Sequence, residues 1–205
     1  QKKYIISNSN KVVSQMSKSI GEMGQQLCSS PTEAYILDDS EGDYLDDFLI
    51  NLNQSLENNF EQYEDLDKNY IKLDRMLSYA ADNGSDVFKS KKYGNKIVLI
   101  KSLKSSVFSK MEPDLTLSIH ERRNFLEFIV VEKLDEIAIL INKISQNETH
   151  KSVKKIQTIL VFGDDIFVKK IISLAKIVSA YRVIDHNYVF RRHTMEALDG
   201  KHLVS

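Results

Sequence analysis

The clearest pattern of apolar positions runs from Leu45 to Ala80, where apolar residues recur at alternating spacings of four and three. No proline or glycine interrupts the chain before Gly84, so the pattern predicts one helix over residues 43–82. Such a helix of about 40 residues would be roughly 60 Å long. A stripe this narrow is typical of coiled coils. The predicted interface consists of Leu45, Leu49, Leu52, Leu56, Asn59, Tyr63, Leu66, Tyr70, Leu73 and Leu77.

One polar residue, Asn59, falls within this stripe. A buried asparagine commonly fixes the register of a coiled coil at a cost in stability. The alternative is that Phe60 turns inward and Asn59 faces water. The sequence leaves both interpretations open.

Four further segments complete the predicted organisation. Apolar residues spaced by three and four predict a helix over residues 10–28, and an acidic linker follows over residues 29–42. Residues 95–147 are predicted to form a helical pair kinked at Pro113. The last segment, residues 151–198, is basic and is predicted to be helical.

This last segment allows a second interpretation. Lys154–Asp165 could form a β-strand that ends at Gly163, followed by a helix over Ile166–Ala180. Lys96–Ile100 could then be a second strand. We favour one helix over residues 152–181, because no alternation of strands and helices is sustained elsewhere. The turn also lacks the several glycines of a phosphate-binding loop.

Composition agrees with a helical fold. The 205 residues include only two prolines and seven glycines, too few for the frequent turns of an all-β protein. We therefore predict an all-α fold, an elongated bundle or hairpin forming a single domain over residues 1–205, as a fragment of a longer chain. Cys28 is the only cysteine, so no intramolecular disulfide can form. No apolar run reaches the roughly 20 residues that span a bilayer, and a cytoplasmic or nuclear location is expected.

Charge is arranged in blocks along the chain. All charged residues from Glu33 to Asp67 are acidic, and all those from Val87 to Met111 are lysines. The two blocks could dock on each other within the fold. A basic face could instead bind anionic lipid, with nucleic acid less expected, or an acidic protein partner. The predicted basic surface consists of Lys89, Lys91, Lys92, Lys96, Lys101, Lys104 and Lys110.

No motif indicates catalysis. The five histidines (His120, His150, His186, His193 and His202) show no metal-ligand spacing, and no nucleotide-binding fingerprint is present. Asp164 and Asp165 could hold a metal in an α/β enzyme, but such a pair more often begins a helix. We therefore predict no catalytic residue, no cofactor and no metal.

Together these patterns predict a non-enzymatic scaffold that assembles with a protein partner or with itself through the stripe. Three long helices in about 200 residues, with clustered lysines, resemble BAR domains. That resemblance, carried by helix length, implies a dimer that binds anionic membranes. The scaffold itself is expected to act in membrane trafficking, cytoskeletal or chromosome-associated machinery. A third hypothesis is a nucleotide- or metal-dependent α/β enzyme built around Ile159–Asp165.

Overall fold

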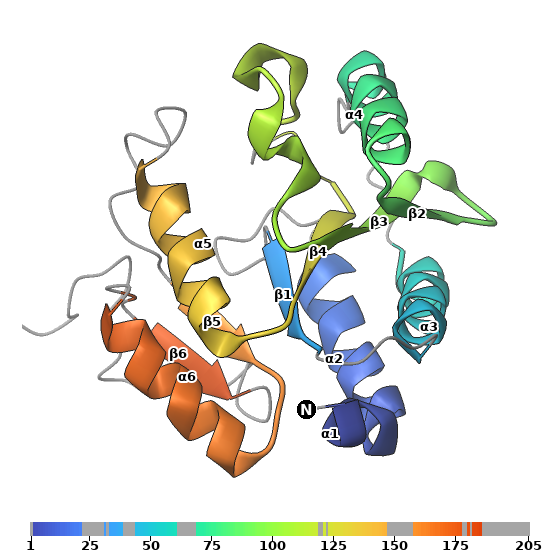
Figure 1. Ribbon diagram of the computed structural model, residues 1–205. Coiled ribbons are helices and arrows are strands. Elements are labelled where there is room, and N and C mark those ends of the chain that lie inside the picture. The colour runs from blue at the N-terminus through green and yellow to red at the C-terminus, as the bar shows by residue number, and fades with distance from the viewer. Residues whose placement is uncertain are drawn as a thin grey trace, which may run out of the picture. The chain divides into compact units, whose positions relative to one another are not determined.

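The protein is a mixed α/β chain. The computed structural model describes residues 2–21, 31, 33–38, 44–60, 69–118, 121, 123–146, 158–177, 180 and 182–185. The chain divides into two compact units. Figure 1 colours the ribbon by residue number, from blue at the N-terminus to red at the C-terminus. Residues 9–133 form the central unit, and residues 1–8 with 134–205 form the terminal unit.

A four-stranded sheet organises the central unit. Its strand order is β1-β4-β3-β2, with β1, β4 and β3 parallel and β2 antiparallel to β3. The strands are β1 (Glu33–Leu37), β2 (Asp86–Ser90), β3 (Gly94–Leu103) and β4 (Phe125–Val131). The helices are α2 (Ser9–Gly21), α3 (Tyr44–Asn58) and α4 (Tyr70–Asp82), with the 3-10 turns η2 (Val107–Lys110) and η3 (Pro113–Leu115).

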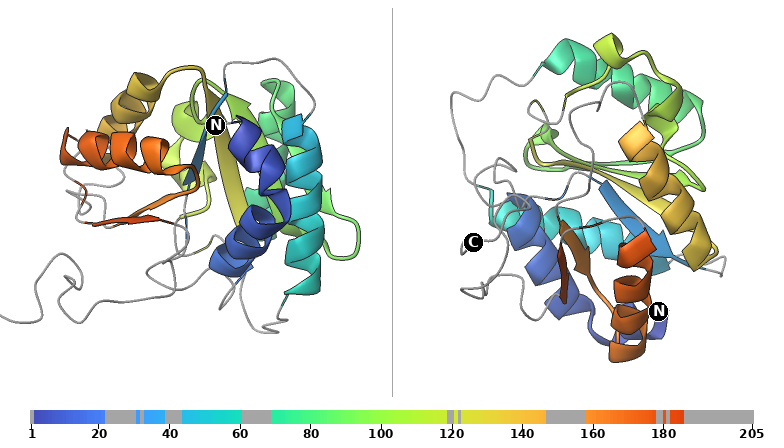
Figure 2. Two further views of the ribbon diagram at one scale, coloured as in Figure 1. Left: turned by 90° about the horizontal axis from the view of Figure 1, so that it is seen from below. Right: turned by 90° about the vertical axis from the view of Figure 1, so that its left-hand side faces the viewer.

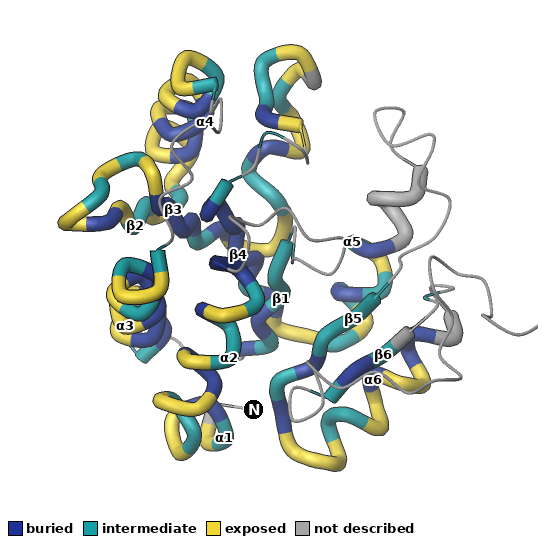
Figure 3. Tube along the Cα trace, turned by 180° about the vertical axis from the view of Figure 1, so that it is seen from behind, coloured by how far each residue is buried: buried dark blue, intermediate teal, exposed yellow. Residues whose placement is uncertain are grey.

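Helices cover both faces of this sheet. In the right-hand view of Figure 2, α4 lies on one side of the sheet and α2 and α3 lie on the other. Strand β4 is therefore buried almost throughout, which explains its nearly continuous apolar sequence. Figure 3 shows the same burial as dark blue along β4 and along the inner face of α3. On the α4 face the core comprises Leu73, Met76, Leu77, Ala80, Val98, Ile100, Phe108, Leu117 and Phe125.

Helix α3 also closes the outer edge of the sheet. The side-chain amide of Asn53 donates to the carbonyl oxygen of Phe88 on β2, at 3.0 Å. Near the hairpin tip, the carboxylate of Glu57 accepts hydrogen bonds from the Ser90 hydroxyl at 2.6 Å and from the Lys92 amide at 3.2 Å. The hydrogen bond from Ser90 is the main cause that lowers the pKa of Glu57. An edge strand with its outward carbonyl occupied is a poor template for pairing with another chain.

The terminal unit contains a parallel βαβ arrangement. Strands β5 (Thr158–Val161) and β6 (Arg182–Asp185) pair in parallel, and α6 (Asp165–Ile177) connects them. The unit also contains α1 (Lys2–Ser7) and α5 (Leu134–Gln146). None of the described helices is long and apolar enough to cross a membrane.

The prediction of an all-α fold is wrong. The predicted helix over residues 43–82 is two helices, because residues 59, 60 and 69 are not helical. Its leucine stripe is real, but it packs inside the central unit, on the sheet and, for α3, also on α2. A helix that covers a sheet shows the same period as a coiled-coil seam. The predicted helical pair over residues 95–147 contains β3, β4 and α5 instead. A strand buried on both faces is an apolar run without a period, and short runs of this kind do not distinguish strand from helix.

The less favoured interpretation of the last third agrees with the structure. Strand β5 ends at Val161, Gly163 lies in the turn, and α6 begins at Asp165. The second strand suggested over residues 96–100 lies within β3. The single helix over residues 152–181 is therefore wrong as well.

Candidate functional site

Three adjacent parallel strands of the central unit end beside one another. In open α/β sheets, ligands bind at the carboxyl ends of such strands. The residues that directly follow β1, β4 and β3 are Asp38, Glu132 and Lys104. The amide of Asp38 donates to the carbonyl of Val131 at 2.9 Å, and the amide of Lys104 donates to that of Val130 at 2.8 Å. These hydrogen bonds hold Asp38, Lys104 and Glu132 at one edge, which we call the carboxyl edge.

Lys104 lies in a strained turn. Its φ is 64°, and the amide of Ser105 donates to the carbonyl of Leu103 at 2.8 Å, closing a three-residue turn around the lysine. A left-handed conformation costs a residue with a side chain about 1–2 kcal/mol, and glycine would avoid that cost. Among the described non-glycine residues, only Asn124 shares a positive φ, and asparagine tolerates that region better than lysine does.

Lys104 and Glu132 form an ion pair across the ends of β3 and β4. The Lys104 Nζ lies 3.7 Å from the Glu132 Oε1, and the two side chains are 77% and 59% exposed. An exposed pair of this kind contributes about 0–1 kcal/mol to stability. The ion pair is therefore too weak to account for a lysine at this strained position.

A buried carboxylate, that of Glu127, holds both flanks of the Lys104 turn, and we call it the clamp. Glu127, in the middle of β4, is only 2% exposed. Its Oε1 accepts hydrogen bonds from the Ser102 hydroxyl at 2.6 Å and the Val107 amide at 2.8 Å, and its Oε2 accepts from the Ser106 hydroxyl at 2.6 Å. Ser102 precedes the Lys104 turn and Ser106 follows it. One carboxylate thus fixes both flanks of the turn.

Burial decides the electrostatics of this clamp. Desolvation raises the pKa of Glu127, and the nearby carboxylate of Glu33 raises it further. The hydrogen bonds from Ser102, Ser106 and Val107 oppose this shift without cancelling it. Glu33 is the register partner of Glu127 on β1. Both Glu127 oxygens already accept hydrogen bonds, so the geometry suits a structural clamp better than a proton carrier.

Glu33 in turn accepts a hydrogen bond from a neighbour on its own strand. The Tyr35 hydroxyl donates to the Glu33 Oε2 at 2.7 Å. Burial raises the pKa of Tyr35 strongly, and the carboxylates of Glu33 and Glu127 add to the effect. The sheet face beside the clamp is therefore acidic, and Lys104 is the cation that pairs with Glu132 at the carboxyl edge.

The βα turn of the terminal unit is surrounded by carboxylates and has no counterpart of Lys104 among its described contacts. The Asp164 carboxylate accepts a hydrogen bond from the Phe167 amide at 2.8 Å and caps α6, and Asp165 lies in the first turn of the helix. Asp185 ends β6. Burial raises the pKa of Tyr4, and these three carboxylates raise it further, so all three lie within electrostatic range of one hydroxyl.

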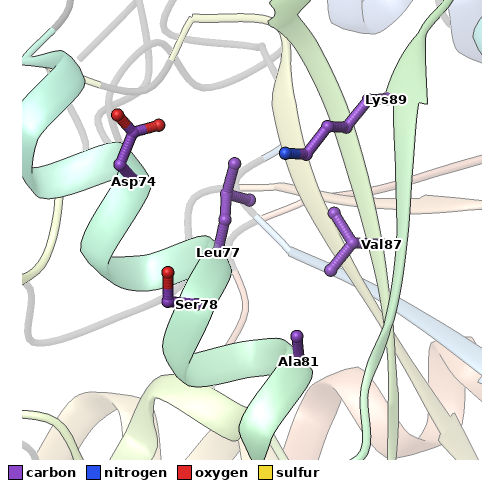
Figure 4. Close-up of a pocket in the computed structure, with 6 residues that line it drawn as sticks. All are labelled: Asp74, Leu77, Ser78, Ala81, Val87 and Lys89. Atoms are coloured by element: carbon purple, nitrogen blue, oxygen red, sulfur yellow. The ribbon is translucent and has the colours of Figure 1, made fainter.

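A shallow groove lies between α4 and β2 (Figure 4). It has a volume of about 320 Å³ and an apolar floor of Leu77, Ala81 and Val87, with Asp74 and Lys89 at its sides. The Asp74 carboxylate already accepts a hydrogen bond from the Asn95 side chain at 2.9 Å. The groove therefore offers a weaker polar constellation than the carboxyl edge.

Most residues of the predicted interface pack inside the central unit. The four leucines of α3 are buried (Leu45, Leu49, Leu52 and Leu56), as are Leu73 and Leu77 of α4. Asn59 and Tyr70 are exposed, and Tyr63 and Leu66 lie outside the described residues. Asn59 donates to the Ser17 hydroxyl at 3.1 Å, which joins the end of α3 to α2. Phe60 is half-buried and packs against Tyr93, with ring centroids 4.4 Å apart and ring planes tilted by 38°.

The predicted basic surface is divided by the fold. Lys89, Lys91 and Lys92 are exposed around the hairpin of β2 and β3. Lys101 instead pairs with Asp46 of α3, and its Nζ also lies 2.8 Å from the Oδ2 of Asp86 on β2. Burial alone would lower the pKa of Lys101, but the two carboxylates outweigh it and raise that pKa. The contact with Asp46 joins one residue of the acidic block to one residue of the lysine block. Lys96 and Lys110 are exposed, and Lys104 lies at the carboxyl edge.

The metal-ligating and nucleophilic side chains considered in the sequence fall largely outside the described residues. Among the residues that the structure describes, no three His, Cys, Asp or Glu side chains are grouped so as to hold a metal ion. Cys28 and all five histidines lie outside the described residues. Sequence reasoning did not single out Glu127 or Glu132. The available signal for Glu127 was its place as the one acid within the apolar run FLEFIVV.

Comparisons with known proteins identify the fold. No family model and no curated protein matches the sequence. Solved structures of aldehyde dehydrogenases do match. Glyceraldehyde-3-phosphate dehydrogenase from Methanocaldococcus jannaschii, complexed with NADP, is 13% identical, with a TM-score of 0.59 over 92% of this chain. Indole-3-acetaldehyde dehydrogenase from P. syringae is 10% identical, with a TM-score of 0.60 over 92% of this chain.

A third neighbour, methylmalonate-semialdehyde dehydrogenase from Oceanimonas doudoroffii, is 11% identical, with a TM-score of 0.59 over 93% of this chain. The chain spans only 39%, 37% and 39% of these three structures, respectively. At such low identity the likeness establishes the α/β fold, and the neighbours' activities remain statements about the neighbours.

These likenesses contradict three earlier predictions. The coiled-coil scaffold is wrong, because the chain has the fold of dehydrogenase domains. The expectation that the chain belongs to no enzyme is contradicted for the same reason, and so is the assignment to membrane trafficking. The third hypothesis, an α/β enzyme, agrees better with the fold.

Proposed function

We propose that this chain is part of an aldehyde-converting oxidoreductase and contributes α/β structure to it. The observation that carries the proposal is the similarity to aldehyde dehydrogenase structures over 87–95% of the chain, with TM-scores from 0.52 to 0.60. The activity belongs to the whole protein, since the chain spans about two fifths of the length of those neighbours.

Several neighbours are complexed with NAD+ or NADP, which makes the βα turn of the terminal unit a candidate contact for the diphosphate of a dinucleotide. A diphosphate needs free backbone amides and little negative charge at a helix N-terminus. Here the Asp164 carboxylate already occupies the Phe167 amide, and Asp165 and Asp185 add negative charge. These residues do not fit a diphosphate. The proposal therefore assigns no dinucleotide contact to the turn.

The chain's own contribution is the carboxyl edge. Lys104 and Glu132 stand at the ends of adjacent parallel strands, where a substrate of an open α/β sheet is held. Leu103, which is 66% exposed, offers an apolar surface beside the lysine. These groups suit binding and orienting a substrate that has an apolar part and a polar part. The residue that reacts with the aldehyde is left unassigned.

The test uses the full protein that contains this chain. Aldehydes are supplied with NAD+ or with NADP+, and formation of the reduced nicotinamide is followed by its absorbance. We expect turnover that falls at least about tenfold when Lys104 is replaced by Ala, because a contact to substrate is lost. The matched control Lys89→Ala, on the hairpin, should keep the wild-type rate. The absence of turnover with every aldehyde and both dinucleotides would reject the proposal.

A further inference from the structure

A lysine, Lys104, occupies a backbone conformation that favours glycine. Glycine fits a positive φ without strain, and of the three other described residues with a positive φ two are glycines, Gly84 and Gly94, and the third is Asn124. At Lys104 it uses a long cationic side chain, whose ion pair with Glu132 is exposed and weak. Backbone strain that the surrounding structure holds in place clusters at functional sites. The lysine side chain therefore has a use outside the fold's own contacts.

The support beneath the turn points the same way. The Glu127 carboxylate holds Ser102 before the turn and Ser106 after it, and it is itself buried in β4. A buried acid that accepts three hydrogen bonds keeps the turn in one conformation. A turn that is already rigid lowers the conformational entropy that Lys104 would lose on contacting a ligand.

The chemistry of the edge defines the ligand. Strand β4 lies between β1 and β3, so Asp38 is about 10 Å from the backbone of Lys104 at the usual strand spacing. Glu132 stands between them and holds the lysine's ammonium group at 3.7 Å. A carboxylate at this loose distance is a partner that a ligand anion can displace. The exposed Leu103 next to it would contact an apolar part of the same ligand.

We propose that Lys104 binds the anionic group, a carboxylate or a phosphate, of a ligand at the carboxyl edge, and that Glu127 is the positioning residue that holds the Lys104 turn. As a statement about the substrate, this rests on the proposed function and adds an anionic group to the aldehyde. Anion binding itself is measured without turnover, so the two proposals can fail separately.

The experiment follows backbone amide resonances of the protein by NMR during titration with inorganic phosphate and, separately, with acetate. Saturable shifts at Lys104 and Ser105 are expected with one or both anions, and their relative affinity distinguishes phosphate from carboxylate. Lys104→Gly should abolish these shifts and raise Tm by roughly 2–4 °C through relief of strain. Lys89→Ala, the matched exposed lysine on β2, should leave them unchanged.

Two further variants test the geometry. Glu132→Gln removes the competing carboxylate and should tighten anion binding severalfold. Glu127→Gln keeps the side chain's shape but weakens the clamp, so it should weaken anion binding and increase hydrogen exchange at Val107, with exchange in α3 unchanged. The conservative Lys104→Arg should retain binding.

Three outcomes would overturn the inference. The first is that neither anion gives a saturable shift at the turn in the wild type or in Glu132→Gln. The second is that Lys104→Gly binds anions like the wild type. The third is that Lys104→Gly lowers Tm, which would give the lysine a purely structural use. Loss of dinucleotide-linked turnover with anion binding intact would reject only the proposed function.

Discussion

The ends of β3 and β5, one strand from each unit, are followed by side chains of opposite charge. In the central unit the carboxyl end of β3 is followed by Lys104, in a strained turn above a buried acid. In the terminal unit the carboxyl end of β5 is followed by Gly163 and two aspartates, one of which caps α6. The end of β3 thus carries a cation, with Glu132 and Asp38 at the neighbouring strand ends, whereas the end of β5 is followed by carboxylates alone. Topology indicates where a ligand would lie, and the local side chains decide its charge.

The two ends also differ in what stabilises them. Below Lys104, three hydrogen bonds converge on Glu127, which is buried among strands. At α6, a single capping hydrogen bond to Asp164 lies at the surface. Loss of the buried acceptor should therefore cost more than loss of the exposed cap, because the Ser102 hydroxyl is buried and the other two donors are only partly open to water. The four predictions below test this contrast in order of size.

The largest effect is expected at the clamp. Glu127→Ala leaves two hydroxyls and the Val107 amide without their acceptor, and it should lower the free energy of unfolding by about 3 kcal/mol. Urea denaturation followed by circular dichroism measures this. Glu112→Ala, an exposed glutamate of the same unit, should change stability by less than about 0.5 kcal/mol. A loss below about 1 kcal/mol for Glu127→Ala would mean that the turn is held by other contacts.

The second prediction concerns pH. Burial raises the pKa of Glu127 above its ordinary 4.5, with Glu33 as the charged neighbour, so the folded state binds this proton more tightly than the unfolded state. The stability that this proton contributes is present at low pH and is lost as pH rises from 4.5 through the raised pKa. The wild type should therefore lose stability relative to Glu127→Gln over that interval.

Denaturation of both proteins at several pH values above 4.5 checks the sign. Lowered pKa values at Glu57 and Glu121 act in the opposite direction, with stability lost as pH falls, but both groups are present in the two proteins and cancel in the difference. A difference that grows in favour of the wild type as pH rises would show that the hydrogen bonds outweigh burial at Glu127.

The third prediction moves to the terminal unit. Asp164→Ala removes the acceptor for the Phe167 amide and should lower the stability of this unit by about 1 kcal/mol. Asp164→Ser keeps a capping oxygen and should recover most of that loss. Hydrogen exchange at the Phe167 amide reports on the cap directly. Equal stabilities of the Ala and Ser variants would show that the capping hydrogen bond has no energetic role.

The contrast between the units also explains what the sequence could and could not predict. The period of the leucines correctly marked the buried faces of α3 and α4, because a helix turns its apolar side inward whatever it packs on. It could not specify the partners, which are the sheet for both helices and also α2 for α3. Strands β3 and β4 lacked a period because both of their faces are buried.

The candidate site was harder to predict than the fold. Lys104 appeared only as one lysine among seven, since nothing in its neighbourhood reveals a positive φ. Glu127 lies 23 residues later, and its contact with the turn depends on the parallel pairing of β3 and β4. By contrast, Gly163 and Asp164 are adjacent in sequence and act locally, and the strand-turn-helix alternative around them is the part that agreed with the structure.

The smallest effect is expected at Asp165. Burial is the largest cause of the raised pKa of Tyr4, followed by Asp185, Asp164 and then Asp165. Asp165→Asn should therefore lower the Tyr4 pKa toward its ordinary 10.0, and it should do so less than Asp185→Asn does. The same change weakens a favourable helix-dipole contact, so stability should fall by only about 0.5 kcal/mol. Titration of Tyr4 by NMR, with ring carbons labelled, measures the order. If Asp165→Asn moves the Tyr4 pKa more than Asp185→Asn, the ends of β5 and β6 do not gather their carboxylates as described, and the charge contrast between the two units weakens.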